Sequence, residues 1–208
     1  MRDQLSAVLE RARQLGFLGP GEPGDHRVHA SAFIAAWDAR SDAPPASLCD
    51  LGAGGGVPGL VLALHWRQTL TVLLEAAERR CAFLEDAIDE LGLGVTASVA
   101  QGRAEALART LDLQGRFVLV TARSFGAPAV VAECAARLLA PGGVLMVAEP
   151  PDAARTTTRW PEGGLAALGL GPAVPATSIR HLVVIERRGP CPDRFPRRVG
   201  VPSKRPLF

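Results

Sequence analysis

The sequence predicts an α/β fold in which a mostly parallel sheet carries helices on both faces. Apolar segments of strand length alternate with helix-length segments from residue 47 to residue 148, which is the pattern of repeated βαβ units. The first of these strands runs directly into a glycine-rich turn at 52–59. A final apolar segment at 180–187 reads as one more strand, and we expect it to be antiparallel and to close the sheet.

The elements follow in a simple order. We expect a helix at 2–15, where Leu5, Val8, Leu9, Ala12 and Leu15 share one face, then a Gly/Pro loop at 16–25 and a second helix at 27–38. Residues 150–172 read as irregular, with a short helix near 164–168. The expected strands are 47–51, 69–74, 95–100, 116–121 and 143–148, and the expected helices between them are 58–66, 78–91, 103–110 and 127–139.

Length and composition indicate one core with two additions. At 208 residues the chain can form a single domain. We expect an N-terminal helical cap at 1–46, the α/β domain at 47–188 and a basic tail at 189–208. The four cysteines are far apart and form no C-x-x-C pair, which argues against a zinc site or disulfides and suits a cytoplasmic protein. No apolar run is long enough to cross a membrane.

The segment Asp50–Gly59 indicates a cofactor pocket. Its glycines allow a sharp turn and a close approach of backbone to ligand, and the helix that follows offers free N–H groups. Glu75 ends the next strand, 23 residues after Gly52, near the spacing at which an acidic side chain meets ribose hydroxyls. Together these features predict a site for an adenosine-containing cofactor, against the alternative of a glycine turn with no ligand.

The form of the loop favours S-adenosylmethionine. The register Gly54–Gly59 fits G-x-G-x-x-G only loosely, and Pro58 removes an N–H donor that a pyrophosphate would need. No G-K-[ST] follows the glycines, so a Walker loop is excluded. D-x-G-x-G-x-G is instead typical of S-adenosylmethionine sites.

Two further strand ends face the same crevice. Gly102-Arg103-Ala104-Glu105 follows the third strand, and Thr121-Ala122-Arg123 ends the fourth. Ligands of such sheets bind beyond the carboxyl ends of the strands. Arg123 is therefore a candidate functional residue, with a surface ion pair as the alternative.

These motifs, taken in order, resemble a known family. The chain carries Asp50–Gly59, Glu75 with Arg79-Arg80, the GRAE segment at 102–105, the TAR segment at 121–123 and a P-R-R-x-G tail at 196–200. They are similar to the bacterial small-subunit (16S) ribosomal RNA guanine-N(7) methyltransferases, the glucose-inhibited division protein B family. The GRAE, TAR and tail segments are more specific than the glycine loop, which many methyltransferases share.

The resemblance implies a class I, Rossmann-like, S-adenosylmethionine-dependent methyltransferase acting on a guanine in the 530 loop of 16S ribosomal RNA. It implies a cofactor site made of Asp50, Gly52, Gly54, Val57, Glu75, Ala104, Glu105 and Arg123. Arg123 would lie at the junction of cofactor and substrate and would orient them. The small ribosomal subunit or its RNA would be the partner.

Two departures keep other functions open. The family's N-terminal region carries asparagines, which this chain lacks, and the Lys common after the fifth strand is here Glu149. Both changes fall where RNA would lie, so a small-molecule methyltransferase is an alternative, and a non-enzymatic adenosine-ligand binder is a second. His26 and His29 have a metal-like spacing but no third ligand nearby, so we expect no metal and a surface or N-terminal role for both.

Methylation of guanine N(7) needs no general base or cysteine nucleophile, and the sequence shows no convincing candidate for either. N(7) is a lone pair with no proton to lose, so its methylation needs alignment rather than a general base. No [ND]-P-P-[YFW] motif follows the fourth strand, and Glu149-Pro150-Pro151-Asp152 after the fifth lacks the aromatic residue. Cys191 comes after the last strand, so we interpret it as structural rather than as a nucleophile.

The tail is basic on an otherwise acidic chain. Seven of the 23 Lys and Arg residues lie at 187–208 with one acidic residue, which leaves residues 1–186 with a net charge of −4. We expect this tail to contact RNA phosphates. The alternative is that its prolines strap it across the domain and its arginines pair with the acidic body. The candidate phosphate contacts are Arg194, Arg197, Arg198, Lys204 and Arg205.

Overall fold

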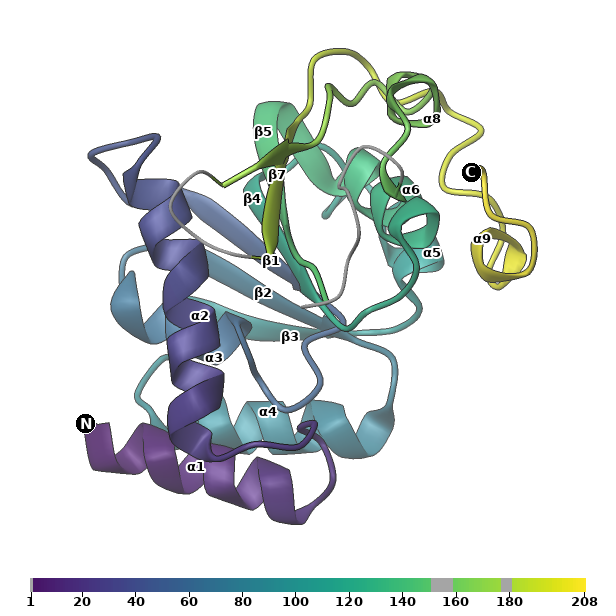
Figure 1. Ribbon diagram of the computed structural model, residues 1–208. Helices are drawn as coiled ribbons and strands as arrows, with labels where there is room; N and C mark the ends of the chain where they lie inside the picture. The colour runs from purple at the N-terminus through teal and green to yellow at the C-terminus, as the bar shows by residue number, and fades with distance from the viewer. Residues whose placement is uncertain (1, 151–158, 177–180) are drawn as a thin grey trace.

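A seven-stranded sheet forms the centre of the protein (Figure 1). The computed structural model describes residues 2–150, 159–176 and 181–208. The strand order is β3-β2-β1-β4-β5-β7-β6, in which β1 to β5 are parallel and β7 and β6 are antiparallel to their neighbours. The strands are β1 (Ser47–Leu51), β2 (Leu70–Glu75), β3 (Ala97–Gln101), β4 (Phe117–Arg123), β5 (Leu139–Ala148), β6 (Val174–Pro175) and β7 (Leu182–Glu186).

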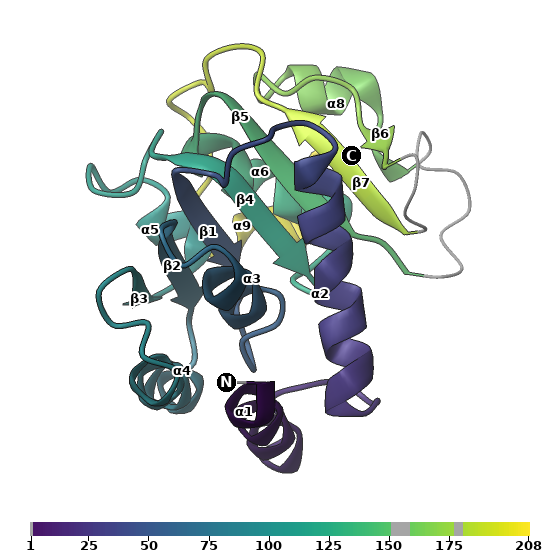
Figure 2. The same ribbon diagram turned by 90° about the vertical axis from the view of Figure 1, so that its left-hand side faces the viewer.

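Helices cover both faces of the sheet, as predicted, and Figure 2 shows the two helical layers on either side of it. One layer consists of α5, α6 and α8, and the other consists of α1, α2, α3 and α4. The helices are α1 (Arg2–Gln14), α2 (Pro23–Asp38), α3 (Gly59–His65), α4 (Glu78–Glu90), α5 (Ala104–Leu107), α6 (Pro128–Leu138), α8 (Glu162–Ala166) and α9 (Val201–Lys204). Within the described residues, no helix has the length and apolar character needed to cross a bilayer.

Four elements differ most from the sequence prediction, and one of them is the short helix α9 (Val201–Lys204) in the tail, which was not predicted. Helix α2 begins at Pro23 rather than 27, because proline suits a first helical turn and the Asp25 carboxylate accepts a hydrogen bond from the Glu22 N–H at 3.2 Å. Strand β5 extends back to Leu139 across Pro141 and Gly142, where the pairing with β4 is irregular. The two-residue strand β6 was not predicted, since so short an edge strand carries no periodic signal. Arg180, the first residue expected in the last strand, lies outside the described residues.

The order of the strands places a crevice between β1 and β4. The chain moves outward from β1 through β2 to β3, then returns to β4 on the other side of β1. The loops that leave β1 and β4 therefore diverge at this point and open a crevice at the carboxyl ends of the strands. All five residues of β1 are buried, so the strand that supports the crevice is enclosed on both faces.

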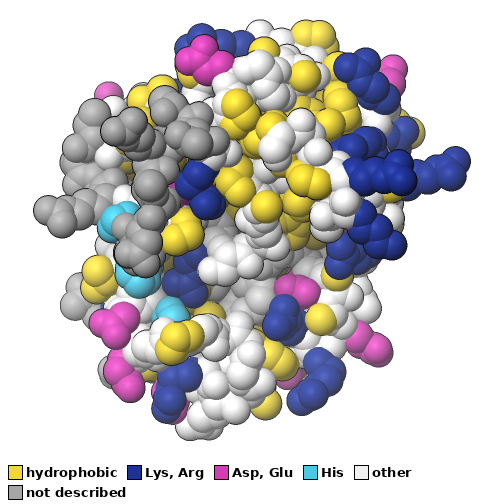
Figure 3. All heavy atoms as spheres, turned by 45° about the vertical axis from the view of Figure 1, so that its right-hand side comes forward, with side chains coloured by type: hydrophobic (Ala, Val, Ile, Leu, Met, Phe, Trp, Pro, Cys, Tyr) yellow, Lys and Arg dark blue, Asp and Glu magenta, His cyan; other side chains and the backbone are white. Residues whose placement is uncertain are grey.

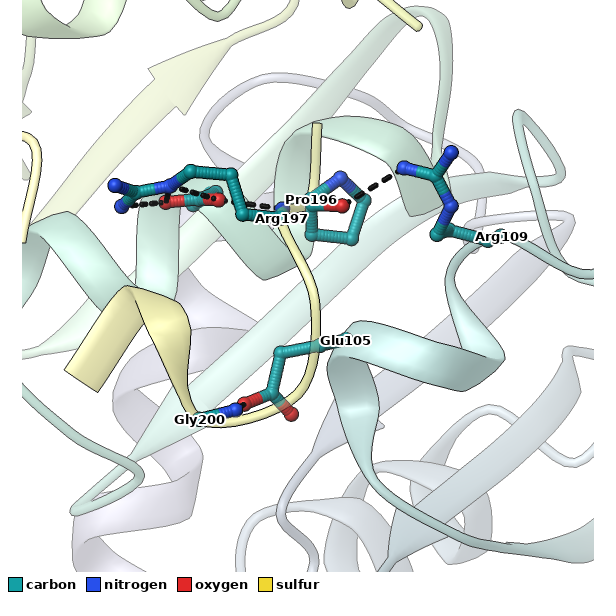
Figure 4. A network of polar contacts seen from close by, with 6 residues as sticks. Glu105, Arg109, Pro196, Arg197 and Gly200 are labelled. Carbon is teal, nitrogen blue, oxygen red and sulfur yellow. Dashed lines mark hydrogen bonds and ion pairs between the residues drawn. The ribbon is translucent and has the colours of Figure 1, made fainter. Parts of the chain in front are cut away.

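The basic tail lies against the domain rather than extending from it. The Arg109 guanidinium donates to the Pro196 carbonyl at 2.8 Å, and the Gly200 N–H donates to the Glu105 carboxylate at 3.0 Å (Figure 4). Arg197 binds Glu133 of α6 most closely: its backbone N–H donates at 2.7 Å and its Nη2 at 2.6 Å. Because the Glu133 side chain is fully buried, this pair fixes the tail to the core.

The contact between Arg197 and Glu133, called the strap below, should make a measurable contribution to the stability of the protein. Arg197→Ala leaves the buried Glu133 carboxylate without its cation, a change that costs roughly 3–5 kcal/mol in closed interiors. The Arg197 side chain keeps 25% of its surface exposed, so we expect a loss at or below the lower end of that range, measured by thermal and denaturant unfolding. The control is Arg198→Ala, which removes the neighbouring exposed arginine and should change stability by less than about 0.5 kcal/mol. Equal effects in the two variants would show that the strap does not hold the tail.

Candidate functional site

The Asp50 carboxylate organises the crevice at the end of β1. Its Oδ2 accepts a hydrogen bond from the Gly59 N–H at 2.9 Å, and its Oδ1 accepts one from the Thr121 hydroxyl at 2.8 Å. The carboxylate thereby joins β1, the start of α3 and β4. Burial raises the pKa of Asp50 to about 6, against the opposing effect of the Thr121 and Gly59 hydrogen bonds.

Gly59 is required by the closeness of this contact. A Cβ atom at residue 59 would lie 2.6 Å from Asp50 Oδ2 and 2.4 Å from a methyl of Leu73. Any side chain would therefore separate the helix start from the carboxylate. The sequence predicted that this glycine loop brings its backbone close to a ligand. At Gly59 the backbone instead comes close to the Asp50 carboxylate of the protein itself.

Glu75 supports the glycine loop from the end of β2. Its Oε2 accepts from the Gly54 N–H at 3.0 Å, and its Oε1 accepts from the Ala76 and Ala77 N–H groups at 2.8 and 2.9 Å. The Arg80 guanidinium lies 3.9 Å from Oε2. Each carboxylate oxygen has two lone pairs, so Oε1 is fully used and Oε2 keeps one acceptor position. This geometry leaves one acceptor position that a ribose hydroxyl could use.

A small cavity of ≈ 180 Å³ lies beside Glu75. Four of the predicted cofactor residues line it: Gly52, Glu75, Ala104 and Glu105. The ring of Phe125 lies over Gly52, where a Cβ atom would approach it to within 2.4 Å. The cavity therefore has a floor of glycine backbone and an acidic residue on each of two sides.

Four of the eight predicted cofactor residues lie outside the lining of this cavity, and Arg123, described below, is one of them. Asp50 acts behind the loop through the contacts already described, and the Val57 side chain is buried in a hydrophobic cluster with α1 and α3. Gly54 takes part through its N–H, which Glu75 accepts. Contacts of all eight predicted residues with a cofactor stay predictions.

Glu105 connects the cavity with the tail. Its Oε1 accepts from the Gly200 N–H, whereas its Oε2 is buried and has no hydrogen-bond partner within the described residues. Burial opposes its ionisation, but hydrogen bonds from the backbone N–H groups of Gly200 and Glu105 and from Arg103 outweigh burial and lower the pKa of Glu105. A buried carboxylate oxygen without a donor fits a ligand that brings an N–H or O–H group.

A second, larger cavity of ≈ 820 Å³ adjoins the first. Ser124 and Phe125 line both cavities, so the loop after β4 separates them. Arg123 belongs to the larger cavity, where both of its terminal nitrogens lie 3.3 Å from His26 Nδ1. Figure 3 shows the space-filling surface of one face of the molecule, with side chains coloured by type.

The structure changes the interpretation of the two histidines. His26, expected near the surface, is only 4% exposed and contacts the predicted functional arginine, whereas His29 is exposed. No periodic signal marks this contact in the sequence, because 97 residues separate the partners. No group of three metal-binding side chains occurs in the part of the chain that the structure describes.

Comparison with known proteins decides the family. Residues 25–153 match the family described as rRNA small subunit methyltransferase G (GidB). The protein called ribosomal RNA small subunit methyltransferase G in Rubrobacter xylanophilus is 32% identical over 99% of this chain and 85% of its own length. Its counterpart in Pelotomaculum thermopropionicum is 31% identical over 97% of this chain and 87% of its own.

The chain belongs to the GidB family. The family resemblance predicted from the motifs is therefore confirmed. Among solved structures, PigF with SAH has a TM-score of 0.57, with 18% identity over 77% of this chain and 56% of that one, which shows the shared fold alone. The predicted fold, the methyltransferase class and the S-adenosylmethionine cofactor of this GidB chain are likewise confirmed.

The main departure of this GidB chain from the family pattern lies in the larger cavity. Glu149, where the resemblance led us to expect Lys, lines it and accepts hydrogen bonds from Arg159 Nε at 2.6 Å and Trp160 Nε1 at 3.1 Å. The Arg159 guanidinium thus supplies a cation beside this position. The charges of Glu149 and Arg159 are thus paired with each other at this position.

We expect Glu75→Ala to weaken S-adenosylmethionine binding by about ten- to a hundredfold, because hydrogen bonds to a charged group contribute roughly 1.5–3 kcal/mol. Calorimetry on the folded variant measures this. Since the same carboxylate holds three backbone N–H groups, we also expect a lower melting temperature. Glu75→Asp keeps a carboxylate and should retain more of both properties. Unchanged affinity in folded Glu75→Ala would remove Glu75 from the cofactor site.

Proposed function

We propose that this protein transfers a methyl group from S-adenosylmethionine to N(7) of a guanine in the 530 loop of 16S ribosomal RNA. Membership of the GidB family and the name of its relatives support the substrate class. The observation that carries the proposal is the adjacency of two cavities, one with the predicted cofactor residues and one with Arg123, joined at Ser124 and Phe125. A ribosomal substrate would place the reaction in the cytoplasm.

The smaller cavity fits the adenosine part of the cofactor. The free acceptor position on Glu75 Oε2 suits a ribose hydroxyl, and the unpartnered Glu105 Oε2 suits the adenine amine. At ≈ 180 Å³ the cavity is smaller than the roughly 300–1,000 Å³ of most ligand sites, so the rest of the cofactor would continue past Phe125. When bound, the cofactor supplies an electrophilic methyl group on sulfur.

We assign an aligning role to the larger cavity, because guanine N(7) has no proton for a base to remove. The Arg123 guanidinium can donate to the O6 atom of a guanine, beside N(7), or to the cofactor carboxylate. Glu149, the buried carboxylate in this cavity, already accepts two hydrogen bonds from Arg159 and Trp160. These arrangements suit a nucleophile that needs no proton removed.

The exposed part of the tail is the proposed RNA surface. Arg194, Arg198, Lys204 and Arg205 are exposed, and Figure 3 shows Lys and Arg side chains gathered on the right-hand part of the face, where the tail lies in Figure 1. Arg197 belongs to the strap instead, because Glu133 takes its guanidinium. The two interpretations of the tail thus apply to different residues: prolines and Arg197 attach it, and its remaining cations face outward.

A small-molecule methyltransferase is the second candidate. The acidic residue at position 149 favours it, because an RNA site at this position would ordinarily be basic. The two candidates differ in whether undermodified small subunits or their RNA accept the methyl group. A third possibility, a binder without activity, is set aside by the methyltransferase class of the family.

We expect wild-type protein to transfer label from S-adenosylmethionine to small-subunit RNA that lacks the modification. Arg123→Ala should reduce this transfer by about a hundredfold, since misplaced reactants lose about that much rate. Arg123→Lys should not restore it, because a planar fork differs from a point charge. Full transfer by Arg123→Ala would return Arg123 to a structural role, and no transfer to RNA by the wild type would favour the small-molecule alternative.

We expect the exposed cations of the tail to determine the salt dependence of RNA binding. Removal of one cation that neutralises a phosphate should reduce the slope of log affinity against log salt by roughly 0.7–0.9. Replacing Arg198, Lys204 and Arg205 with Ala should lower the slope stepwise while cofactor affinity stays constant. Arg40→Ala, at an exposed position just after α2, is the matched control. An unchanged slope in the triple variant would overturn the proposal that the tail binds phosphates.

A further inference from the structure

We propose that His26, in its neutral form, is a positioning residue for Arg123 that fixes the guanidinium without neutralising its charge. The inference rests on the proposed function, because it assigns a task to the Arg123 charge at the methyl-transfer site. His26 lies in the first turns of α2, and Arg123 ends β4, so the contact joins the N-terminal region to the crevice. Helix α2 therefore contributes a side chain to the proposed site.

The hydrogen bonds define the protonation state of the imidazole. An arginine side chain only donates hydrogen bonds, so His26 Nδ1, 3.3 Å from Arg123 Nη1 and 3.3 Å from Nη2, must be the acceptor. An imidazole that accepts at Nδ1 is neutral and carries its proton on Nε2. Protonation at Nδ1 would place two donors and two positive charges against each other and would break the contact.

The surroundings of His26 favour the same state. Burial lowers the pKa of His26, and the charge of Arg123 lowers it further. His29 acts in the same direction and Asp25 opposes it, while His26 Nε2 is buried and has no hydrogen-bond partner among the described residues. The geometry and the local charges therefore agree on a neutral imidazole at neutral pH.

The partner leaves the charge of Arg123 available. Among the described residues Arg123 forms no ion pair with a carboxylate, although Asp50 acts on it electrostatically from nearby. The Asp50 oxygens accept from Gly59 and Thr121, and no hydrogen bond joins Asp50 to Arg123 among the described residues. A neutral acceptor thus orients the guanidinium, and its positive charge remains for an electron-rich atom in the cavity of ≈ 820 Å³ that both residues line.

Two substitutions of equal size separate orientation from charge. His26→Asn offers Arg123 a neutral amide oxygen, and His26→Asp offers a carboxylate in the same place. We expect His26→Asn to retain most of the methyl transfer. His26→Asp should lose between about ten- and a hundredfold, as Arg123 is drawn into an ion pair, while it melts at the same temperature or higher. The matched control pair is His65→Asn and His65→Asp, since His65 is exposed on α3.

The pH dependence supplies a readout that a packing role would not change. Wild-type transfer should fall as pH decreases through the pKa of His26, which lies below the ordinary histidine value of about 6.5, because protonated His26 can no longer accept from Arg123. His26→Asn should lack that part of the decrease. Asp50 titrates in the same range in both proteins, so the difference between the two profiles reports His26.

The closing experiment combines transfer assays on small-subunit RNA with NMR titration of the His26 ring. We expect an unprotonated Nδ1 in the wild type and a higher His26 pKa in Arg123→Met. If the wild type methylates RNA but His26→Asp is as active as His26→Asn, the inference is wrong and the proposed function stands. If the wild type does not methylate RNA, the proposed function fails, and the titration still decides the contact. If the pKa of His26 is the same in Arg123→Met as in the wild type, the inferred contact is wrong.

Discussion

The buried carboxylate of Asp50 is the contact on which the crevice depends. It joins the end of β1 to the first turn of α3 and to β4, and only a glycine at position 59 allows the helix to come this close. An isolated charge would be costly in this position, and the two donated hydrogen bonds offset that cost. The path of the glycine loop, which lines the small cavity at Gly52, follows from this interaction.

The same principle recurs at the neighbouring strand ends. Glu75 after β2 holds N–H groups of the glycine loop and of the start of α4, and Glu105 after β3 holds the N–H of Gly200 in the tail. Carboxylates at three strand ends thus fix backbone in advance, and Glu75 and Glu105 each keep acceptor capacity toward the cavity. Binding to such a site requires little rearrangement of these two groups, which is what preorganisation means in physical terms. The tail and α2 complete the site from the two ends of the chain.

Local patterns predicted most of the fold and part of the site. The buried parallel strands are continuous apolar runs, and Glu75 and the GRAE segment lie at fixed distances from the ends of those runs, so sequence alone located them. The contact between His26 and Arg123 and the pair of Arg197 with Glu133 join residues 97 and 64 positions apart, and no periodicity encodes such pairings. Charge counting showed a basic tail. It could not show that Arg197 binds a buried carboxylate, Glu133, while the other cations of the tail are exposed. The early start of α2 follows from Pro23 and Asp25, a signal present in the sequence but outweighed by the neighbouring glycines.

The most direct test of the proposed function is a map of N(7)-methylguanine in 16S ribosomal RNA from cells that lack the gene. N(7)-methylation places a positive charge on the guanine ring, and the RNA can then be cleaved chemically at that nucleotide. We expect one cleavage site in the 530 loop to disappear in the deletion strain and to return with the wild-type gene but not with the Arg123→Ala gene. An unchanged map in the deletion strain would contradict the assignment of this protein to ribosomal RNA methylation.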